Sequence, residues 1–165
     1  MEQVSAGNLE QKLVVRGGGE VDRITSLIND LLNLGRIEAG FDTRKETVVI
    51  GQVIRFAADN FRKTATEKQI NLVLDLPDTL PHILANPVQM RQMIDNLLDN
   101  AVKYTHSGGT ISVRGGVAQN QLVLQFSDTG IGIPALDMPY VFDKFYRASN
   151  ASQDSTGTGL GLSIV

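Results

Sequence analysis

Four short motifs in the second half of the chain restrict its fold more than any other feature. In chain order they are residues 96–105 (NLLDNAVKYT), 128–134 (DTGIGIP), 142–147 (FDKFYR) and 157–162 (GTGLGL). Any one of them alone is weak evidence, because glycine-rich strings occur wherever a backbone turns tightly. The four together, in this order, are far more restrictive, and the elements that carry them decide what they can form.

The hydrophobic pattern of the chain predicts alternating strands and helices. Five runs rich in apolar or β-branched residues predict strands: 48–50, 70–76, 83–85, 110–117 and 121–127. Apolar residues at helical spacing predict helices over 52–68 and 87–104, the second capped by Asn86 with Pro87 at its first position. Residues 118–121 are the expected hairpin turn. The pattern favours an α/β fold in which helices cover one face of a mixed sheet.

The first 40 residues have a different pattern. Residues 1–19 are polar and end in three glycines, which do not fit a helix interior, so we expect a leader there. Residues 20–40 carry one apolar stripe, which predicts an amphipathic helix ending near Gly40. The stripe consists of Ile24, Leu27, Ile28, Leu31, Leu34 and Ile37. On pattern alone, a helix with one apolar stripe more often packs on its own domain than in a dimer bundle.

Composition excludes several classes of function. With 165 residues, of which 42% are hydrophobic and 20% charged, the chain suits one globular domain plus a short appendage. The net charge of -3 and the lack of a Lys/Arg cluster argue against a nucleic-acid partner. Cysteine is absent, which excludes disulfides and thiolate metal sites. No apolar run reaches the roughly 18 residues that span a bilayer, so we expect no membrane contact by this chain.

Taken in order, the four motifs resemble the catalytic ATP-binding domain of sensor histidine kinases, within the GHKL superfamily. The resemblance implies a two-layer α/β sandwich of the Bergerat type over residues 41–165, with ATP and Mg²⁺ as ligands. Residues 31–40 (LLNLGRIEAG) are similar to the end of the second helix in the family's dimerisation hairpin, which reverses the preference for packing on the chain's own domain. Residues 1–19 loosely resemble the end of a HAMP signal-relay module.

The family resemblance also implies a reaction and partners. The expected reaction is transfer of the γ-phosphoryl group of Mg·ATP to a histidine on another molecule. The expected partners are the histidine-bearing dimerisation domain and the receiver domain of a response regulator, with homodimerisation left open. The expected location is the cytoplasm, in a parent kinase that is anchored in a membrane.

The helical motif supplies two polar side chains on one face. Asn96 and Asn100 are four residues apart and therefore share a helix face. A neutral amide oxygen can complete the shell of Mg²⁺ while phosphates supply the charge, and the resemblance assigns the metal to Asn100. The resemblance gives Lys103 and Tyr104 phosphate and adenine contacts. Asn96 is the catalytic candidate, and the resemblance places it where related ATPases carry a glutamate that activates water. Because an amide cannot take up a proton, Asn96 favours phosphoryl transfer over hydrolysis.

The DTGIGIP motif predicts the adenine end of the site. Asp128 ends a strand, where its carboxylate can accept the exocyclic amine of adenine, a hydrogen bond that guanine cannot supply. Gly130 and Gly132 let the backbone approach the base closely. An aspartate in an ordinary Gly-Pro turn is the plainer interpretation, and the other three motifs argue against it.

The last two motifs predict the phosphate end of the site. Arg147 can fork onto phosphate oxygens. Backbone amides of a loop that opens a helix can cradle phosphates; the expected residues are Gly157, Thr158, Gly159, Leu160, Gly161 and Leu162. Phe142 and Phe145 are expected to lie in a short helix and to pack against the core. Residues 148–156 are the expected mobile lid.

Two departures from the family pattern limit the expected activity. The phosphoacceptor segment that typically reads Ser-His-Glu-Leu-Arg-Thr-Pro is absent, and the only histidines, His82 and His106, are expected in surface loops. The family also continues past the position of Val165, so we expect a C-terminally truncated domain that binds ATP without phosphorylating itself. Two alternatives stay open: another GHKL enzyme, such as a serine-directed anti-sigma kinase or a true ATPase, and a non-catalytic module that binds nucleotide or a partner.

Overall fold

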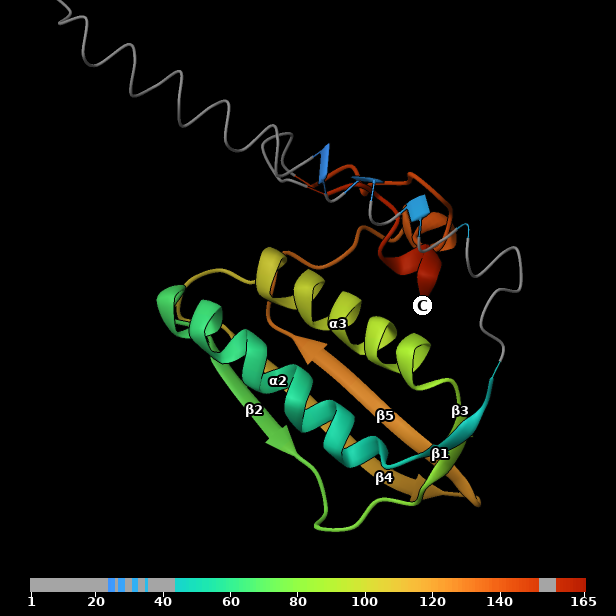
Figure 1. Ribbon diagram of the computed structural model, residues 1–165. Helices are drawn as coiled ribbons and strands as arrows, with labels where there is room; N and C mark the ends of the chain where they lie inside the picture. The colour runs from blue at the N-terminus through green and yellow to red at the C-terminus, as the bar shows by residue number, and fades with distance from the viewer. Residues whose placement is uncertain (1–23, 26, 29–30, 33–34, 36–43, 152–156) are drawn as a thin grey trace, which may run out of the picture.

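The structure is a computed structural model, and it describes residues 24–25, 27–28, 31–32, 35, 44–151 and 157–165. Its main body has two layers, with two helices on one face of a three-stranded sheet (Figure 1). The helices are α2 (Ile50–Glu67) and α3 (Pro87–Tyr104), and the strands are β2 (Asn71–Asp75), β4 (Thr110–Ala118) and β5 (Gln121–Asp128). Strand β4 is parallel to β2 and antiparallel to β5. The predicted α/β sandwich with a mixed sheet is therefore confirmed.

A second, two-stranded sheet lies where both helices begin (Figure 1). Its strands, β1 (Glu46–Val48) and β3 (Ile83–Ala85), are antiparallel and lead directly into α2 and α3. The sequence pattern does not predict a separate sheet. The strand predicted at 48–50 is also wrong at its end, because Ile50 is fully buried and already begins α2. Burial in the helical layer outweighs the β-propensity of this β-branched run.

The core lies between the two helices and the sheet. Ile54 of α2, Ile94 and Leu98 of α3, and Ile111 and Val113 of β4 have no exposed surface. Apolar side chains recur three or four residues apart on each helix, and this stripe faces the sheet.

The start of α3 is fixed by its cap, as the sequence predicts. The Oδ1 atom of Asn86 accepts hydrogen bonds from the backbone N–H groups of Val88 at 2.9 Å and Gln89 at 3.0 Å, and Pro87 follows the cap. These bonds satisfy two of the donors that a helix start leaves unpaired. The motif on α3 is therefore held on a rigid helix with a defined register.

The hairpin between β4 and β5 sets the register that places Asp128. Gln119 and Asn120 form its turn with φ values of 50° and 62°, the left-handed pair expected of a tight two-residue hairpin. In this register Asp128, at the end of β5, lies opposite Ile111. Residues directly opposite each other share a face of the sheet, and Ile111 is buried under the helices. Asp128 therefore lies on the helix-covered face.

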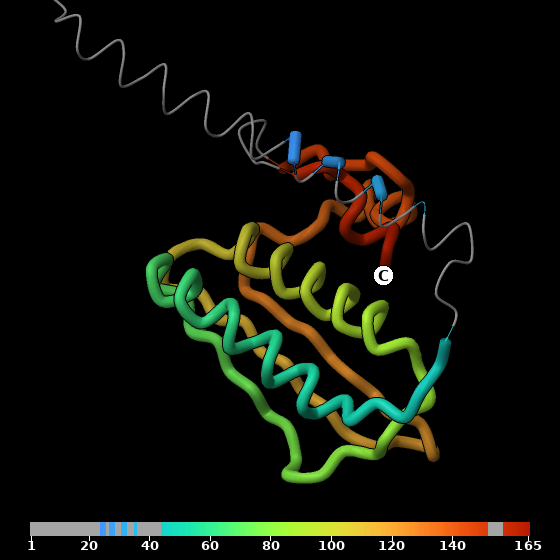
Figure 2. The backbone as a smooth tube through the Cα atoms, in the orientation of Figure 1, coloured from blue at the N-terminus to red at the C-terminus, as the bar shows by residue number. Residues whose placement is uncertain are grey.

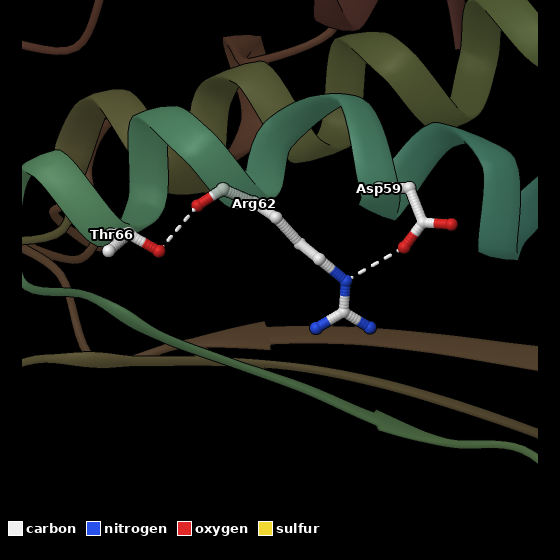
Figure 3. Close-up of polar contacts among 3 residues, drawn as sticks. All are labelled: Asp59, Arg62 and Thr66. Atoms are coloured by element: carbon white, nitrogen blue, oxygen red, sulfur yellow. Dashed lines mark hydrogen bonds and ion pairs between the residues drawn. The ribbon is translucent and has the colours of Figure 1, made fainter.

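The outward face of α2 is polar apart from Phe56, which is 62% exposed. Arg62 Nε contacts Asp59 Oδ1 at 2.7 Å, and Thr66 Oγ1 donates a hydrogen bond to the Arg62 carbonyl at 2.8 Å (Figure 3). These side chains are exposed, and exposed ion pairs contribute on the order of 0 to 1 kcal/mol. This face supports the helix and lies away from the residues of the four motifs.

In the N-terminal region, the described residues 24–25, 27–28, 31–32 and 35 are helical. Ile24, Ile28, Leu31 and Leu32 are each more than half exposed. The ends of the helix predicted over 20–40, and the leader predicted at 1–19, lie outside the described residues. Across the part of the chain that is described, no helix combines the length and apolarity needed to cross a membrane.

The chain after β5 returns along α3 (Figure 2). Just past β5, the Ile131 N–H donates to the carbonyl of Tyr104 at the end of α3 at 3.1 Å. Near the other end of this stretch, the Asn96 side chain donates to the carbonyl of Gly161 at 3.1 Å. The DTGIGIP and GTGLGL motifs are thereby brought against α3, which carries the NLLDNAVKYT motif.

Candidate functional site

A cavity of about 320 Å³ lies between α3, the end of β5 and the segments that follow β5. This size suits a small-molecule ligand, since such sites are commonly about 300 to 1,000 Å³. Residues from all four motifs line it: Asn96, Asn100, Lys103, Tyr104, Asp128, Gly132, Arg147, Gly157, Thr158, Gly159, Gly161 and Leu162. Of the predicted site residues, Gly130 and Leu160 are not in the lining. Residues far apart in the sequence thus line the same cavity.

The polar face of α3 forms one wall of the cavity. Asn96, Asn100 and Lys103 lie on it at helical spacing and are half-buried. The Asn96 amide nitrogen donates to the Gly161 carbonyl, so this side chain also fastens the C-terminal glycine segment to α3. A Cβ atom at Gly161 would lie 3.6 Å from Asn100 Nδ2. Sequence reasoning does not find this fastening role, because the two partners are 65 residues apart.

Asp128 is fixed by the turn that follows it. Its Oδ1 atom accepts a hydrogen bond from the Gly130 N–H at 2.9 Å. A Cβ atom at Gly130 would lie 2.4 Å from the Tyr104 carbonyl oxygen and 2.8 Å from Asp128 Oδ1. Glycine at 130 therefore permits close packing between the turn and the end of α3, rather than space for a ligand. Gly132 has a φ of 66°, which a residue with a Cβ rarely adopts.

Two cationic side chains reach the cavity. The Lys103 ammonium lies 5.4 Å from the centroid of the Tyr104 ring, close enough for a cation–π interaction. A Cβ atom at Gly157 would lie 2.7 Å from Lys103 Nζ and 3.3 Å from Tyr104 Oη, so the glycine backbone sits directly on this pair. Arg147 lines the cavity from the third motif. The wall therefore offers positive charge beside backbone that carries no side chain.

The FDKFYR motif differs from its prediction. It forms turns rather than a helix, after a single 3-10 turn, η1 (Met138–Tyr140). Phe142 and Phe145 are 62% and 58% exposed, so the prediction that they pack against the core is wrong. Phe145 has a φ of 65°, which neither a right-handed α-helix nor a 3-10 helix accommodates. Its backbone packs on Gly159, where a Cβ atom would lie 2.7 Å from the Phe145 carbonyl carbon.

A buried aspartate holds the same segment and is missed by sequence reasoning. Asp137 is 7% exposed and accepts three hydrogen bonds, from Tyr146 Oη at 2.7 Å, Ser149 N at 2.7 Å and Ser149 Oγ at 2.8 Å. The bonds from Ser149 and Tyr146 hold the pKa of Asp137 below its ordinary value. The same carboxylate raises the pKa of the Tyr146 phenol. In sequence, nothing distinguishes Asp137 from an exposed turn residue such as Asp143.

The predicted lid begins beside the DTGIGIP turn. Asn150 Nδ2 donates to the carbonyl of Gly132 at 3.1 Å and of Ile131 at 3.4 Å. Residues 152–156 lie outside the described residues. After them, residues 157–162 lead into η2 (Leu162–Ile164), a single 3-10 turn, so the helix predicted to open at this loop is only one turn in the described chain. Leu160 is fully buried, which makes it a packing residue of this loop.

Metal ligands and histidines are sparse around the cavity. No cluster of three His, Cys, Asp or Glu side chains suited to a metal occurs in the described part of the chain. His82 and His106 are both exposed, as predicted, and neither lines the cavity. Any divalent cation at Asn100 would therefore need most of its negative partners from a ligand.

Residues 85–165 match the sequence model of a family described as histidine kinase-, DNA gyrase B- and HSP90-like ATPases. The chain is 35% identical over 156 residues to Drug sensory protein A of Synechocystis sp., and 34% identical over 149 residues to sensor histidine kinase WalK of Bacillus subtilis. The chain carries an ATP-binding domain of the sensor histidine kinase family. Each of these alignments covers 88% of the chain and 24% of the relative, so the chain spans about a quarter of their length.

A solved histidine kinase structure agrees with this assignment. The fold matches that of full-length ShkA in complex with AMPPNP, with a TM-score of 0.75 and 27% identity over 99% of this chain and 34% of that chain. The histidine kinase domain that the four motifs predict is thereby confirmed. Which residues contact a ligand stays a prediction, and the residues that line the cavity are the candidates.

Proposed function

We propose that the cavity binds Mg·ATP and presents its γ-phosphoryl group to a histidine outside this domain. One observation carries the proposal: residues from all four motifs line the same cavity. The complex of the similar kinase ShkA with AMPPNP supports a nucleotide of this type. The chain spans about a quarter of the relatives that it matches, and the whole reaction is therefore proposed for a protein of their length.

The adenine end of the proposed site lies at Asp128. Its carboxylate is oriented by the Gly130 N–H and reaches the cavity wall. A carboxylate offers only acceptors, so it pairs with the exocyclic amine of adenine and repels the carbonyl that guanine carries at that position. Tyr104, also in the lining, offers an aromatic face to the base.

The phosphate end of the proposed site lies toward Lys103, Arg147 and Gly157. Lys103 acts as a point charge, Arg147 can bind two phosphate oxygens at once, and the backbone at Gly157 can approach them without a side chain in the way. The Asn100 side-chain oxygen is the proposed protein ligand of Mg²⁺. The residues fit the ion because a neutral amide suffices where phosphates bring the charge. When bound, Mg²⁺ neutralises phosphate charge.

The chemistry favoured at Asn96 is phosphoryl transfer. Its amide cannot remove a proton from water, so the site lacks a general base at this position. In the proposed reaction an imidazole nitrogen of the acceptor histidine bonds to the γ-phosphorus, the bond to the bridging oxygen breaks, and ADP leaves. The chain contributes positioning and charge, which dominate catalysis of such transfers. Because neither His82 nor His106 lines the cavity, the acceptor is proposed to come from a dimerisation domain.

The remaining features of the parent protein are also proposals. The amphipathic stretch 20–40 is proposed to be the second helix of the dimerisation hairpin, with a HAMP remnant at 1–19. A response regulator receiver domain is the proposed recipient of the phosphoryl group, in the cytoplasm beneath a membrane-anchored parent. The relative WalK is named as a sensor histidine kinase, which favours this function over an anti-sigma kinase, an ATPase or a non-catalytic module.

Calorimetric titration of Asp128→Asn with Mg·AMPPNP tests the site. A hydrogen bond to a charged group contributes about 1.5 to 3 kcal/mol, so we expect affinity to fall roughly 10- to 150-fold. Asp78→Asn, which makes the same charge change at an exposed loop residue, is the matched control and should bind like the wild type. Equal affinity in both variants would mean that Asp128 does not bind the base. Incubation with γ-labelled ATP should leave no acid-labile, base-stable label on the chain.

A further inference from the structure

We infer that Asp137 is a positioning residue that holds Arg147 at the cavity. The inference rests on the proposed function, because it concerns how the phosphate end of that site is built. Asp137 itself does not line the cavity, whereas Arg147 does. Asp137 therefore acts through Tyr146 and Ser149, which lie on either side of Arg147 in the chain.

The hydrogen bonds of Asp137 bracket Arg147 in the chain. Tyr146, one residue before it, donates its hydroxyl proton to Oδ1, and Ser149, two residues after it, donates both its N–H and its hydroxyl to Oδ2. All three distances are between 2.7 and 2.8 Å, which is typical of strong bonds to an ionised acceptor. The carboxylate thus fixes the chain at both ends of a four-residue stretch.

Asp137 is itself held rigidly. Its N–H donates to the Pro134 carbonyl at 2.9 Å, and its own carbonyl accepts from the Tyr140 N–H at 2.9 Å. The residue is 7% exposed, while Asp143 in the same segment is exposed. A buried carboxylate is costly unless donors surround it, so three donors at this one residue indicate a specific structural task.

The backbone just before Arg147 needs such support. Phe145 has a φ of 65°, a conformation that a bulky L-residue adopts only when its surroundings enforce it. The contact with Gly159 enforces it from one side. Asp137 secures the next residue, Tyr146, from the other, and the ring of Tyr146 lies 5.6 Å from that of Tyr140. Releasing the carboxylate would let this strained turn relax and carry Arg147 away from the cavity.

A double-mutant cycle between Asp137 and Arg147 tests the inference. Wild type, Asp137→Asn, Arg147→Ala and the double variant are titrated with Mg·AMPPNP by calorimetry and with adenosine by NMR. An asparagine cannot accept all three hydrogen bonds, because half of its head group is a donor. We expect Asp137→Asn to weaken AMPPNP binding about tenfold and to leave adenosine binding within about twofold. The double variant should bind no more weakly than Arg147→Ala alone.

Several outcomes would overturn the inference. Additive losses in the double variant would show that Asp137 does not act through Arg147, and equal losses for AMPPNP and adenosine would show a general structural role. Asp143→Asn, with the same charge change in the same segment, is the control and should match the wild type. If Asp137→Asn does not fold, Ser149→Ala serves instead, because it removes only one of the three donors. It should weaken the binding of AMPPNP by a smaller factor and leave the binding of adenosine unchanged. Unchanged AMPPNP affinity in Ser149→Ala would refute the inference. Failure of the wild type to bind AMPPNP would instead refute the proposed function.

Discussion

Replacing Gly130 with alanine should damage both the fold and the site. The added Cβ would lie 2.4 Å from the Tyr104 carbonyl oxygen and 2.8 Å from Asp128 Oδ1, whereas Cβ contacts below 3.0 Å essentially do not occur. Neither neighbour can move freely. The Tyr104 carbonyl ends α3 and accepts the Ile131 N–H at 3.1 Å, and Asp128 Oδ1 accepts the Gly130 N–H at 2.9 Å.

The expected loss follows from these contacts. Breaking the bond between Ile131 and Tyr104 costs about 1 kcal/mol, and the steric displacement costs about 1 to 3 kcal/mol. We therefore expect Gly130→Ala to lower the free energy of unfolding by about 2 to 4 kcal/mol, measured by urea denaturation followed by circular dichroism. Because Asp128 must shift as well, affinity for Mg·AMPPNP should fall by at least about tenfold.

Gly116 offers a matched control in the same sheet. A Cβ atom there would meet no atom within 4 Å. Gly116→Ala should therefore change stability by less than about 1 kcal/mol and leave nucleotide affinity unchanged. If Gly130→Ala unfolds at the same urea concentration as Gly116→Ala and binds AMPPNP equally well, the close packing between the turn and α3 does not exist as described.

Two further predictions concern buried polar groups. Thr105 is 5% exposed, and its hydroxyl has no hydrogen-bond partner among the described residues. Thr105→Val should therefore raise the free energy of unfolding by about 1 kcal/mol in the same urea assay. A loss of stability would contradict the statement that this hydroxyl is unpaired. For Asp137, hydrogen bonds from Ser149 and Tyr146 lower the folded-state pKa below 3.8, so its contribution to stability is present above that pH and is lost as pH falls through the folded-state pKa. The gap in melting temperature between wild type and Asp137→Asn should therefore close from about pH 4 downward, and a gap that stays constant would refute this linkage.

The parts of the fold that the sequence predicts well depend on local signals. Helix α3 begins and ends where its cap and apolar period place it, because Asn86 and Pro87 fix the start independently of the rest of the fold. The hairpin between β4 and β5 is likewise local, since Gln119 and Asn120 complete it between neighbouring strands. The convergence of the motifs follows from these elements together with the family resemblance.

The parts that the sequence does not predict depend on contacts between distant segments. The role of Gly130 follows from where the chain after β5 meets the end of α3, which no local pattern encodes. The burial of Asp137 comes with hydrogen bonds to Tyr146 and Ser149, which are 9 and 12 residues further along the chain. The aromatic spacing in FDKFYR favours a helix that packs inward. The structure instead turns at Phe145, because its backbone must fit against Gly159. Tertiary contact therefore overrides the local preference at the site itself.

Titration of the wild-type chain with Mg·AMPPNP and with Mg·GMPPNP by calorimetry tests the proposed adenine site most directly. Guanine places a carbonyl where adenine offers an amine, so it loses a hydrogen bond to Asp128 that contributes about 1.5 to 3 kcal/mol. We predict that AMPPNP binds and that GMPPNP binds at least about tenfold more weakly. Equal affinities, or no binding of AMPPNP, would contradict the proposal that this cavity is an ATP site.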